Sequence, residues 1–141
     1  MEFTKEMRGT HTLYLPAMLD HHFPLIRHAL RGEGYQVRVL SGGPVEERCP
    51  RNCACYPVSR MVGQMLTALE TGICENPRRS AFLLPPAGAG CAGENHFRPI
   101  EMSLEDAGFP YVPVLALNVR ERQFFSGLSL TPGLVRKALS A

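Results

Sequence analysis

Apolar residues recur along this chain in four short runs, each followed by a stretch with helical spacing. The runs cover residues 11–16, 35–39, 81–85 and 112–117. They are rich in residues that favour strands, and proline or glycine bounds them. The pattern therefore predicts four strands that alternate with helices. Residues 1–10 are mainly polar and are expected to be frayed.

The clearest helical pattern lies between the second and third predicted strands. Pro57 suits a helix start, and an apolar stripe at near-ideal helical spacing follows it. The stripe consists of Val58, Met61, Val62, Met65, Leu66 and Leu69. We interpret its methionines as core residues rather than as cofactor ligands. Further helices are predicted over residues 23–30, 97–107 and 131–139.

This order of elements predicts a protein of the α/β class. Strands that alternate with helices favour a parallel sheet, because parallel neighbours are joined by right-handed crossovers that place helices on its faces. We expect a Rossmann-like three-layer domain with a mostly parallel four-stranded sheet in the order 2-1-3-4. The second strand alternates apolar and polar residues, which is typical of a strand near an edge. Residues 1–141 are expected to form this single domain.

Composition narrows the function classes. The chain is 45% hydrophobic and 20% charged, which is ordinary for a globular domain. Its formal net charge of +2 is too small and too scattered to indicate nucleic acid binding. The apolar runs are far shorter than a membrane span, and the first residues lack the apolar core of a signal peptide. We therefore expect a cytoplasmic protein with no membrane or nucleic acid partner.

Cysteines provide the main candidate chemistry. Four of the five lie in two predicted loops, as Cys49, Cys53 and Cys55 in the first and Cys91 in the second. Each loop follows a predicted strand and precedes a helix, so both should open at one edge of the sheet. Thiolates are ligands of iron–sulfur clusters and of zinc, whereas a buried free cysteine can simply pack as a small hydrophobe. Cys74 lies apart from the others and is interpreted as structural.

A glycine-rich turn surrounds Cys91. The stretch Gly88-Ala-Gly90-Cys91-Ala-Gly93 matches G-x-G-x-x-G and precedes a predicted helix, where main-chain N–H groups can bind phosphate. Gly90 and Gly93 are therefore candidate cofactor-binding residues. The turn follows the third strand rather than the first, so a dinucleotide site is not expected. An anionic ligand and a tight turn without a ligand stay open as alternatives.

Asp20 and His21 follow the first predicted strand. Ligands of open α/β sheets bind outside the carboxyl ends of the strands, so this pair is expected to lie near the cysteine loops. A carboxylate and an imidazole there could transfer protons or bind metal. We consider Asp20 and His21 candidate catalytic residues. The alternative for Asp20 is a helix cap.

Several of these residues occur in a familiar order. The first block consists of Leu13-Tyr-Leu-Pro16, Asp20-His21 and Phe23-Pro24-Leu25. The second block consists of Cys55-Tyr-Pro57, Gly63 and Met65-Leu66. The third block consists of Phe82 to Pro85, Gly90-Cys91, Gly93 and Val112-Pro-Val114. In this order they resemble the domain found in 2-hydroxyacyl-CoA dehydratase activase-related proteins, which is itself related to the dehydratase subunits. The resemblance covers most of residues 11–119.

The resemblance implies an anaerobic bacterial protein with a Rossmann-like domain and a cysteine-ligated [4Fe-4S] cluster. In the dehydratases such a cluster serves the radical dehydration of 2-hydroxyacyl-CoA, and an ATP-hydrolysing activase delivers the electron. Cys55 and Cys91 match the family cysteines. Asp20, His21 and Gly93 also match the family pattern.

This chain departs from that pattern at two motifs. The family cysteine after the Tyr-Pro pair is Val58 here. The second family motif is Gly-Pro-Cys-Arg. This chain has Gly90-Cys91-Ala92 instead, without the proline and the arginine. A third ligand would then be Cys53 or Cys49, or lie outside these 141 residues. The phosphate-binding motifs of the activase are absent from the sequence, so we assign no ATP hydrolysis.

The sequence therefore supports two hypotheses. In the first, the chain binds an iron–sulfur cluster and takes part in electron transfer or acyl-CoA dehydration. It would be at most one component of such an enzyme, working with a protein partner or the remaining domains of a larger chain, and with acyl-CoA as a potential ligand. In the second, it is a non-catalytic α/β interaction module with free thiols or a structural zinc. The chain would be an excised domain or a short relative that has lost its cluster.

Overall fold

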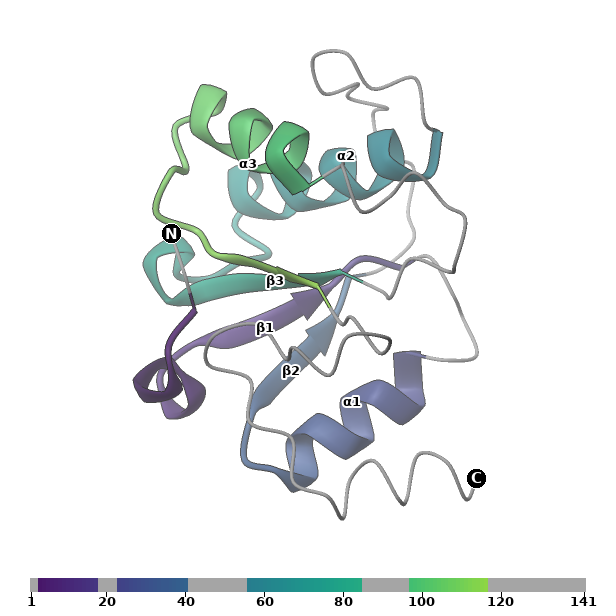
Figure 1. Cartoon of the computed structure of the whole chain (residues 1–141), viewed down its shortest axis with the longest axis vertical. Coiled ribbons are helices and arrows are strands. Elements are labelled where there is room, and N and C mark those ends of the chain that lie inside the picture. Colours follow the sequence, from purple (N-terminus) through teal and green to yellow (C-terminus); the bar gives the residue numbers. More distant parts are fainter. Residues whose placement is uncertain (1–2, 18–22, 41–55, 85–96, 117–141) are drawn as a thin grey trace.

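The computed structural model describes residues 3–17, 23–40, 56–84 and 97–116 (Figure 1). Its elements, in order, are η1 (Lys5–Gly9), β1 (Thr12–Leu15), α1 (Phe23–Gly32), β2 (Gln36–Val39), α2 (Tyr56–Glu70), η2 (Pro77–Arg79), β3 (Ser80–Leu84), α3 (Phe97–Asp106) and β4 (Val114–Ala116). The predicted alternation of strands and helices is confirmed over these residues. The helix predicted at 131–139 lies outside them.

The four strands form one parallel sheet in the order β2-β1-β3-β4. In the centre of the sheet, Leu13 of β1 is in register with Val37 of β2 and with Ala81 of β3. The predicted fold class and strand order are both confirmed. Strand β2 lies at the edge, as its alternating pattern indicated, and every residue of the inner strand β3 is buried.

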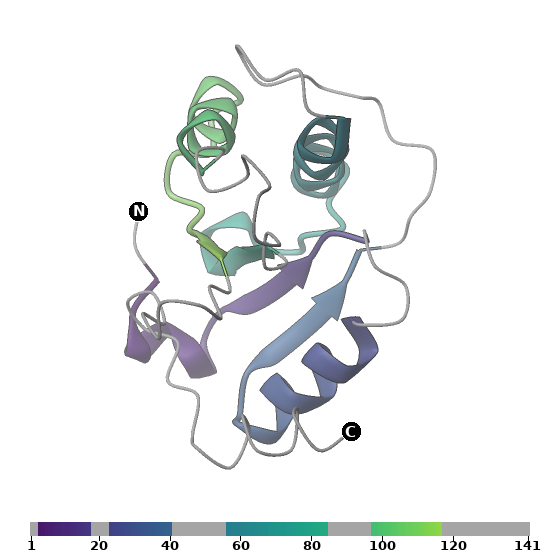
Figure 2. The ribbon, with the colours of Figure 1, turned by 45° about the vertical axis from the view of Figure 1, so that its right-hand side comes forward.

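Helices cover both faces of the sheet (Figure 1). Helix α1 lies on one face, and α2 and α3 lie side by side on the other (Figure 2). Because successive strand residues point to opposite faces, Leu13 and Leu15 join the apolar cluster on the α1 side. Tyr14 joins the cluster beneath α2 and α3. The three layers are therefore α1, the sheet, and the α2–α3 pair.

Helix α2 is the most buried helix that the structure describes. Its buried residues are Val58, Ser59, Met61, Val62, Gly63, Gln64, Met65, Leu66, Ala68 and Leu69. They cover most of the helix circumference, and the face that carries Tyr56, Arg60, Thr67 and Glu70 is not buried. Met65 is fully buried, which confirms the methionine stripe as core.

A glycine with a positive φ follows each of the three described α-helices: Gly34 after α1, Gly72 after α2 and Gly108 after α3. Gly34 has a φ of +86°, a conformation that costs glycine little because it has no Cβ. Its N–H donates to the main-chain oxygen of Arg31, and the N–H of Tyr35 donates to that of Leu30. Gly108 follows α3 in the same way, with a φ of +88°. Helices α1 and α3 therefore stop at a left-handed cap.

The prediction that residues 1–10 are frayed is wrong for the part that the structure describes. Phe3 is only 2% exposed and belongs to the apolar cluster on the α1 side. The following residues form the short helix η1, and the main-chain N–H of His11 donates to the oxygen of Met7. One buried aromatic side chain thus anchors a segment whose remaining residues are mostly polar.

Candidate functional site

The sheet has one position where its connections diverge. The chain leaves β1 towards β2 through α1, and it leaves β3 towards β4 through α3, in the opposite direction. Strands β1 and β3 are hydrogen-bonded neighbours, so their carboxyl ends, at Leu15 and Leu84, lie side by side. Open α/β sheets bind ligands outside such a switch point. We call this region the carboxyl edge.

Every residue of the predicted site belongs to a segment that follows a strand. Asp20 and His21 follow β1, Cys49, Cys53 and Cys55 lie between β2 and α2, and Gly90, Cys91 and Gly93 lie between β3 and α3. All eight lie outside the described residues. Because the sheet is parallel, the strands before these segments all end at the carboxyl edge.

Helix α2 begins beyond this edge (Figure 1). The side chain of Gln64 is hydrogen-bonded to the main chain of Ala17, two residues after the end of β1. Tyr56, the first residue of α2, precedes Gln64 by eight residues, which corresponds to roughly 12 Å of helix. The first two turns of α2 therefore project past β1. Cys55 is the residue immediately before this projecting end.

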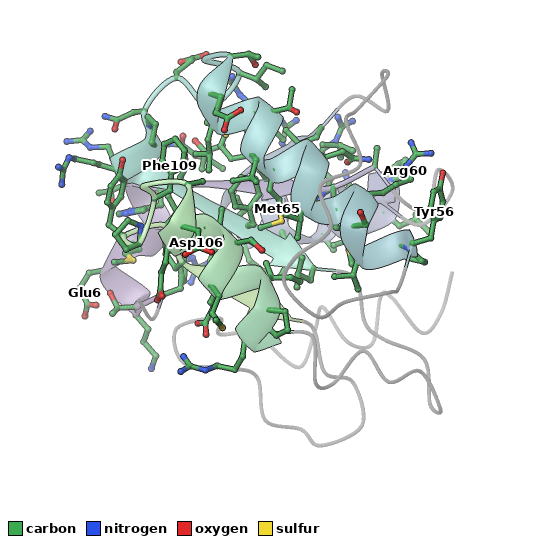
Figure 3. All side chains as sticks on the ribbon, turned by 90° about the horizontal axis from the view of Figure 1, so that it is seen from above. Glu6, Tyr56, Arg60, Met65, Asp106 and Phe109 are labelled. Carbon is green, nitrogen blue, oxygen red and sulfur yellow. The ribbon has the colours of Figure 1, made fainter. Side chains whose placement is uncertain are left out.

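Tyr56 and Arg60 form a pair on these projecting turns (Figure 3). Nη1 of Arg60 donates to the Tyr56 hydroxyl over 3.3 Å, and the guanidinium lies 6.0 Å from the centre of the Tyr56 ring. The Tyr56 side chain is 55% exposed. An exposed aromatic ring next to a guanidinium offers both a stacking surface and a positive charge.

The helices add positive potential at the same edge. Each helix runs back from the carboxyl edge, so the N-termini of α1, α2 and α3 all start there. None of these three helices has an acidic residue in its first turn. Their partial positive charges are therefore not offset by a carboxylate within the first turn. Such an edge favours an anionic ligand.

Cys74 lies away from this region, after the C-terminal end of α2. Its side chain is buried, and burial raises the pKa of the thiol to about 11, although the Ser80 and Tyr14 hydroxyls act in the opposite direction. A thiol with this pKa stays protonated and unreactive near neutral pH. The structural interpretation of Cys74 is consistent with this environment.

Two described residues at this edge were not predicted from the sequence. Arg60 is a charged residue in the first turns of α2, and it belongs to no recognisable sequence motif. Gln64 is 3% exposed and interrupts the apolar stripe next to Met65. Its place beside the apolar stripe could have identified Gln64 from the sequence, because a buried amide needs hydrogen-bond partners.

Within the described residues, no group of three or more His, Cys, Asp or Glu side chains is placed to hold a metal ion. No helix within the described ranges is long and apolar enough to cross a membrane. Comparisons with protein-family models, with curated proteins and with solved structures find no match to this chain.

Proposed function

We propose that this chain binds an iron–sulfur cluster at the carboxyl edge. The ligands would be Cys55, Cys91 and either Cys53 or Cys49, with Asp20 and His21 nearby. One observation supports the proposal: the strands that precede the Asp20–His21 and Cys91 segments end side by side, and Gln64 of α2, the helix that begins after Cys55, is hydrogen-bonded to Ala17 just beyond the end of β1.

The donor set fits such a group. Thiolates are the usual ligands of iron–sulfur clusters, and four cysteines are available in the two segments. A cluster with thiolate ligands is anionic, and three helix N-termini without first-turn carboxylates stabilise negative charge. When bound, the cluster would supply one-electron chemistry.

The same edge suits a phosphate-bearing acyl carrier such as coenzyme A. Arg60 supplies a cation and Tyr56 a ring against which a base can stack. We therefore propose a role in electron transfer or acyl-CoA dehydration, with a partner protein or further domains supplying the rest of the system. This role follows the resemblance to dehydratase activase-related proteins.

Anaerobic reconstitution with iron and sulfide tests the cluster. We would record the visible spectrum and the bound iron of wild type, Cys55→Ala and Cys91→Ala. Cys74→Ala is the matched control, because it removes a cysteine at the opposite end of α2. A broad charge-transfer band in wild type and in the control, but not in the other two variants, would support one cluster held by both segments.

The alternative function predicts a different result. A non-catalytic module with a structural zinc would purify anaerobically as a colourless protein with stoichiometric zinc, and it would lose that zinc in the Cys55→Ala variant. A protein that stays colourless and free of metal after reconstitution would instead be a module with free thiols. Either result would overturn the cluster proposal.

A further inference from the structure

Gln64 makes a paired contact with the main chain at the exit of β1. The N–H of Ala17 donates to Oε1 of Gln64 over 2.7 Å, and Nε2 of Gln64 donates to the oxygen of Ala17 over 3.3 Å. Both polar groups of the side chain thus bind both polar groups of a single residue. The arrangement resembles the exchange of two hydrogen bonds between paired strand residues. It fixes both the position and the orientation of the chain at Ala17.

The main chain needs this partner because the sheet ends here. The described pairing of β1 with β3 ends at Tyr14 and Phe82, and that of β1 with β2 ends at Leu15. Pro16 follows and has no N–H to continue a ladder. At Ala17 the chain has therefore left the strands, and α2 supplies its hydrogen bonds.

Burying the amide of Gln64 costs more free energy than burying an apolar side chain at the same position. Met61 and Ala68 lie one helical turn before and after Gln64, and both are buried apolar residues. An apolar side chain would continue this stripe, whereas burying an amide is unfavourable unless all its hydrogen bonds are made. Among the described residues, Ala17 is the partner of both polar groups of Gln64. Such a contact specifies geometry more than it adds stability.

We infer that Gln64 is a positioning residue of the carboxyl-edge site. It holds Ala17 three residues before Asp20, and it lies on the helix that begins next to Cys55. One side chain thereby sets the start of the Asp20–His21 segment relative to the projecting end of α2. This inference rests on the proposed function, because the site it organises is the proposed cluster site.

The test uses Gln64→Met, which keeps the length of the side chain and removes both hydrogen bonds. Leu69→Ala is the matched control, because it weakens the core under the same helix without touching Ala17. Gln64→Glu is a second variant, which keeps an acceptor for the Ala17 N–H. Circular dichroism confirms that each variant is folded before it is compared.

The first measurement is amide hydrogen exchange by NMR, without any metal. In Gln64→Met the Ala17 amide should exchange about five- to tenfold faster, since one main-chain hydrogen bond is lost, while Leu13 and Leu15 keep their protection. The ring signals of His21 should shift, and those of His28 on the exposed side of α1 should not. Gln64→Glu should keep most of the Ala17 protection. Unchanged Ala17 exchange or unchanged His21 signals would overturn the inference.

The second measurement is cluster retention against a chelator after reconstitution. We expect Gln64→Met to lose the cluster about tenfold more readily than wild type, as for other residues that orient metal ligands. Leu69→Ala should match wild type at an equal folded fraction. Equal retention in Gln64→Met and Leu69→Ala would overturn the positioning role. If wild type forms no cluster, the proposed function fails, and the exchange and His21 measurements still decide whether Gln64 positions this segment.

Discussion

The ring of Phe3 meets the ring of His11 edge-on, with 6.1 Å between the ring centroids and 84° between the planes. This contact joins the first described residue to the residue that precedes β1. Edge-to-face pairs of this kind are more favourable than their buried area alone suggests. The N-terminal segment is therefore part of the folded domain, and it shields one side of His11.

Phe3→Ala should destabilise the protein substantially. The side chain is 2% exposed within the cluster that includes Leu13 and Tyr35, and truncating a buried phenylalanine costs about 3–5 kcal/mol. We expect a value near the lower end, because a terminal segment can relax around the cavity. Urea unfolding followed by circular dichroism measures the change. Lys5→Ala, an exposed change in the same segment, should alter stability by less than about 0.5 kcal/mol.

Stability should fall at acidic pH through His11. Partial burial lowers its pKa below the usual value of 6.5, and nearby Arg79 adds to this effect, while a main-chain hydrogen bond at Arg78 opposes it. The unfolded chain therefore binds a proton at a higher pH than the folded chain. The neutral form stabilises the fold fully above pH 6.5, and this contribution is lost as the pH falls through the lowered pKa.

His11→Gln isolates this effect from the other titrating groups. The free energy of unfolding of wild type, minus that of His11→Gln, should decrease as the pH falls from about 7 to about 5. Urea titrations at matched ionic strength give this difference. A difference that stays constant or increases on acidification would contradict the assigned direction of the pKa shift.

Substitution by alanine should change stability in opposite directions at Gly32 and Gly34. Gly34→Ala places a Cβ on a residue with a φ of +86° and should destabilise by about 1–2 kcal/mol. Gly32→Ala lies at the last position of α1, where nothing approaches the added Cβ within 4 Å. It should stabilise by about 0.5 kcal/mol through the lower entropy of the unfolded chain. Thermal unfolding of both variants gives the signs, and equal signs would refute this explanation of the cap.

Most of the fold was predictable because its signals are local. Strands and helices follow from apolar periodicity, and α1 and α3 end within two residues of the ends predicted at residues 30 and 107. Alternation and right-handed crossovers restrict the strand order without fixing it, so the order 2-1-3-4 was a guess that the structure confirms. The burial of Phe3 was missed, because a single apolar residue in a polar segment has no period. A terminal residue can reach the core only through a tertiary contact.

The candidate site was predictable only in part, for a similar reason. Sequence and topology together give the edge at which the cysteine segments leave the sheet. The contact between Gln64 and Ala17 joins residues 47 positions apart, and no local pattern encodes it. Arg60 beside Tyr56 is a local pair at helical spacing, but spacing alone does not show that the pair lies on turns projecting beyond β1.

The thiol of Cys74 should react much more slowly in the folded protein than in the unfolded protein. Burial raises the pKa of its thiol from 9.0 to about 11, so iodoacetamide at about pH 8 should modify it very slowly in the native state. In urea the thiol is exposed and should react at the rate of an ordinary cysteine. Mass spectrometry of the peptide that contains Cys74 measures both rates.

The same pKa shift links Cys74 to stability at alkaline pH. The folded chain holds this proton more tightly than the unfolded chain, so the contribution is complete below pH 9.0 and is lost as the pH rises towards about 11. Cys74→Ala should therefore lose less stability than wild type over that interval. Native Cys74 that reacted as fast as it does in urea would show that the side chain is accessible, and the structural role assigned to it would be wrong.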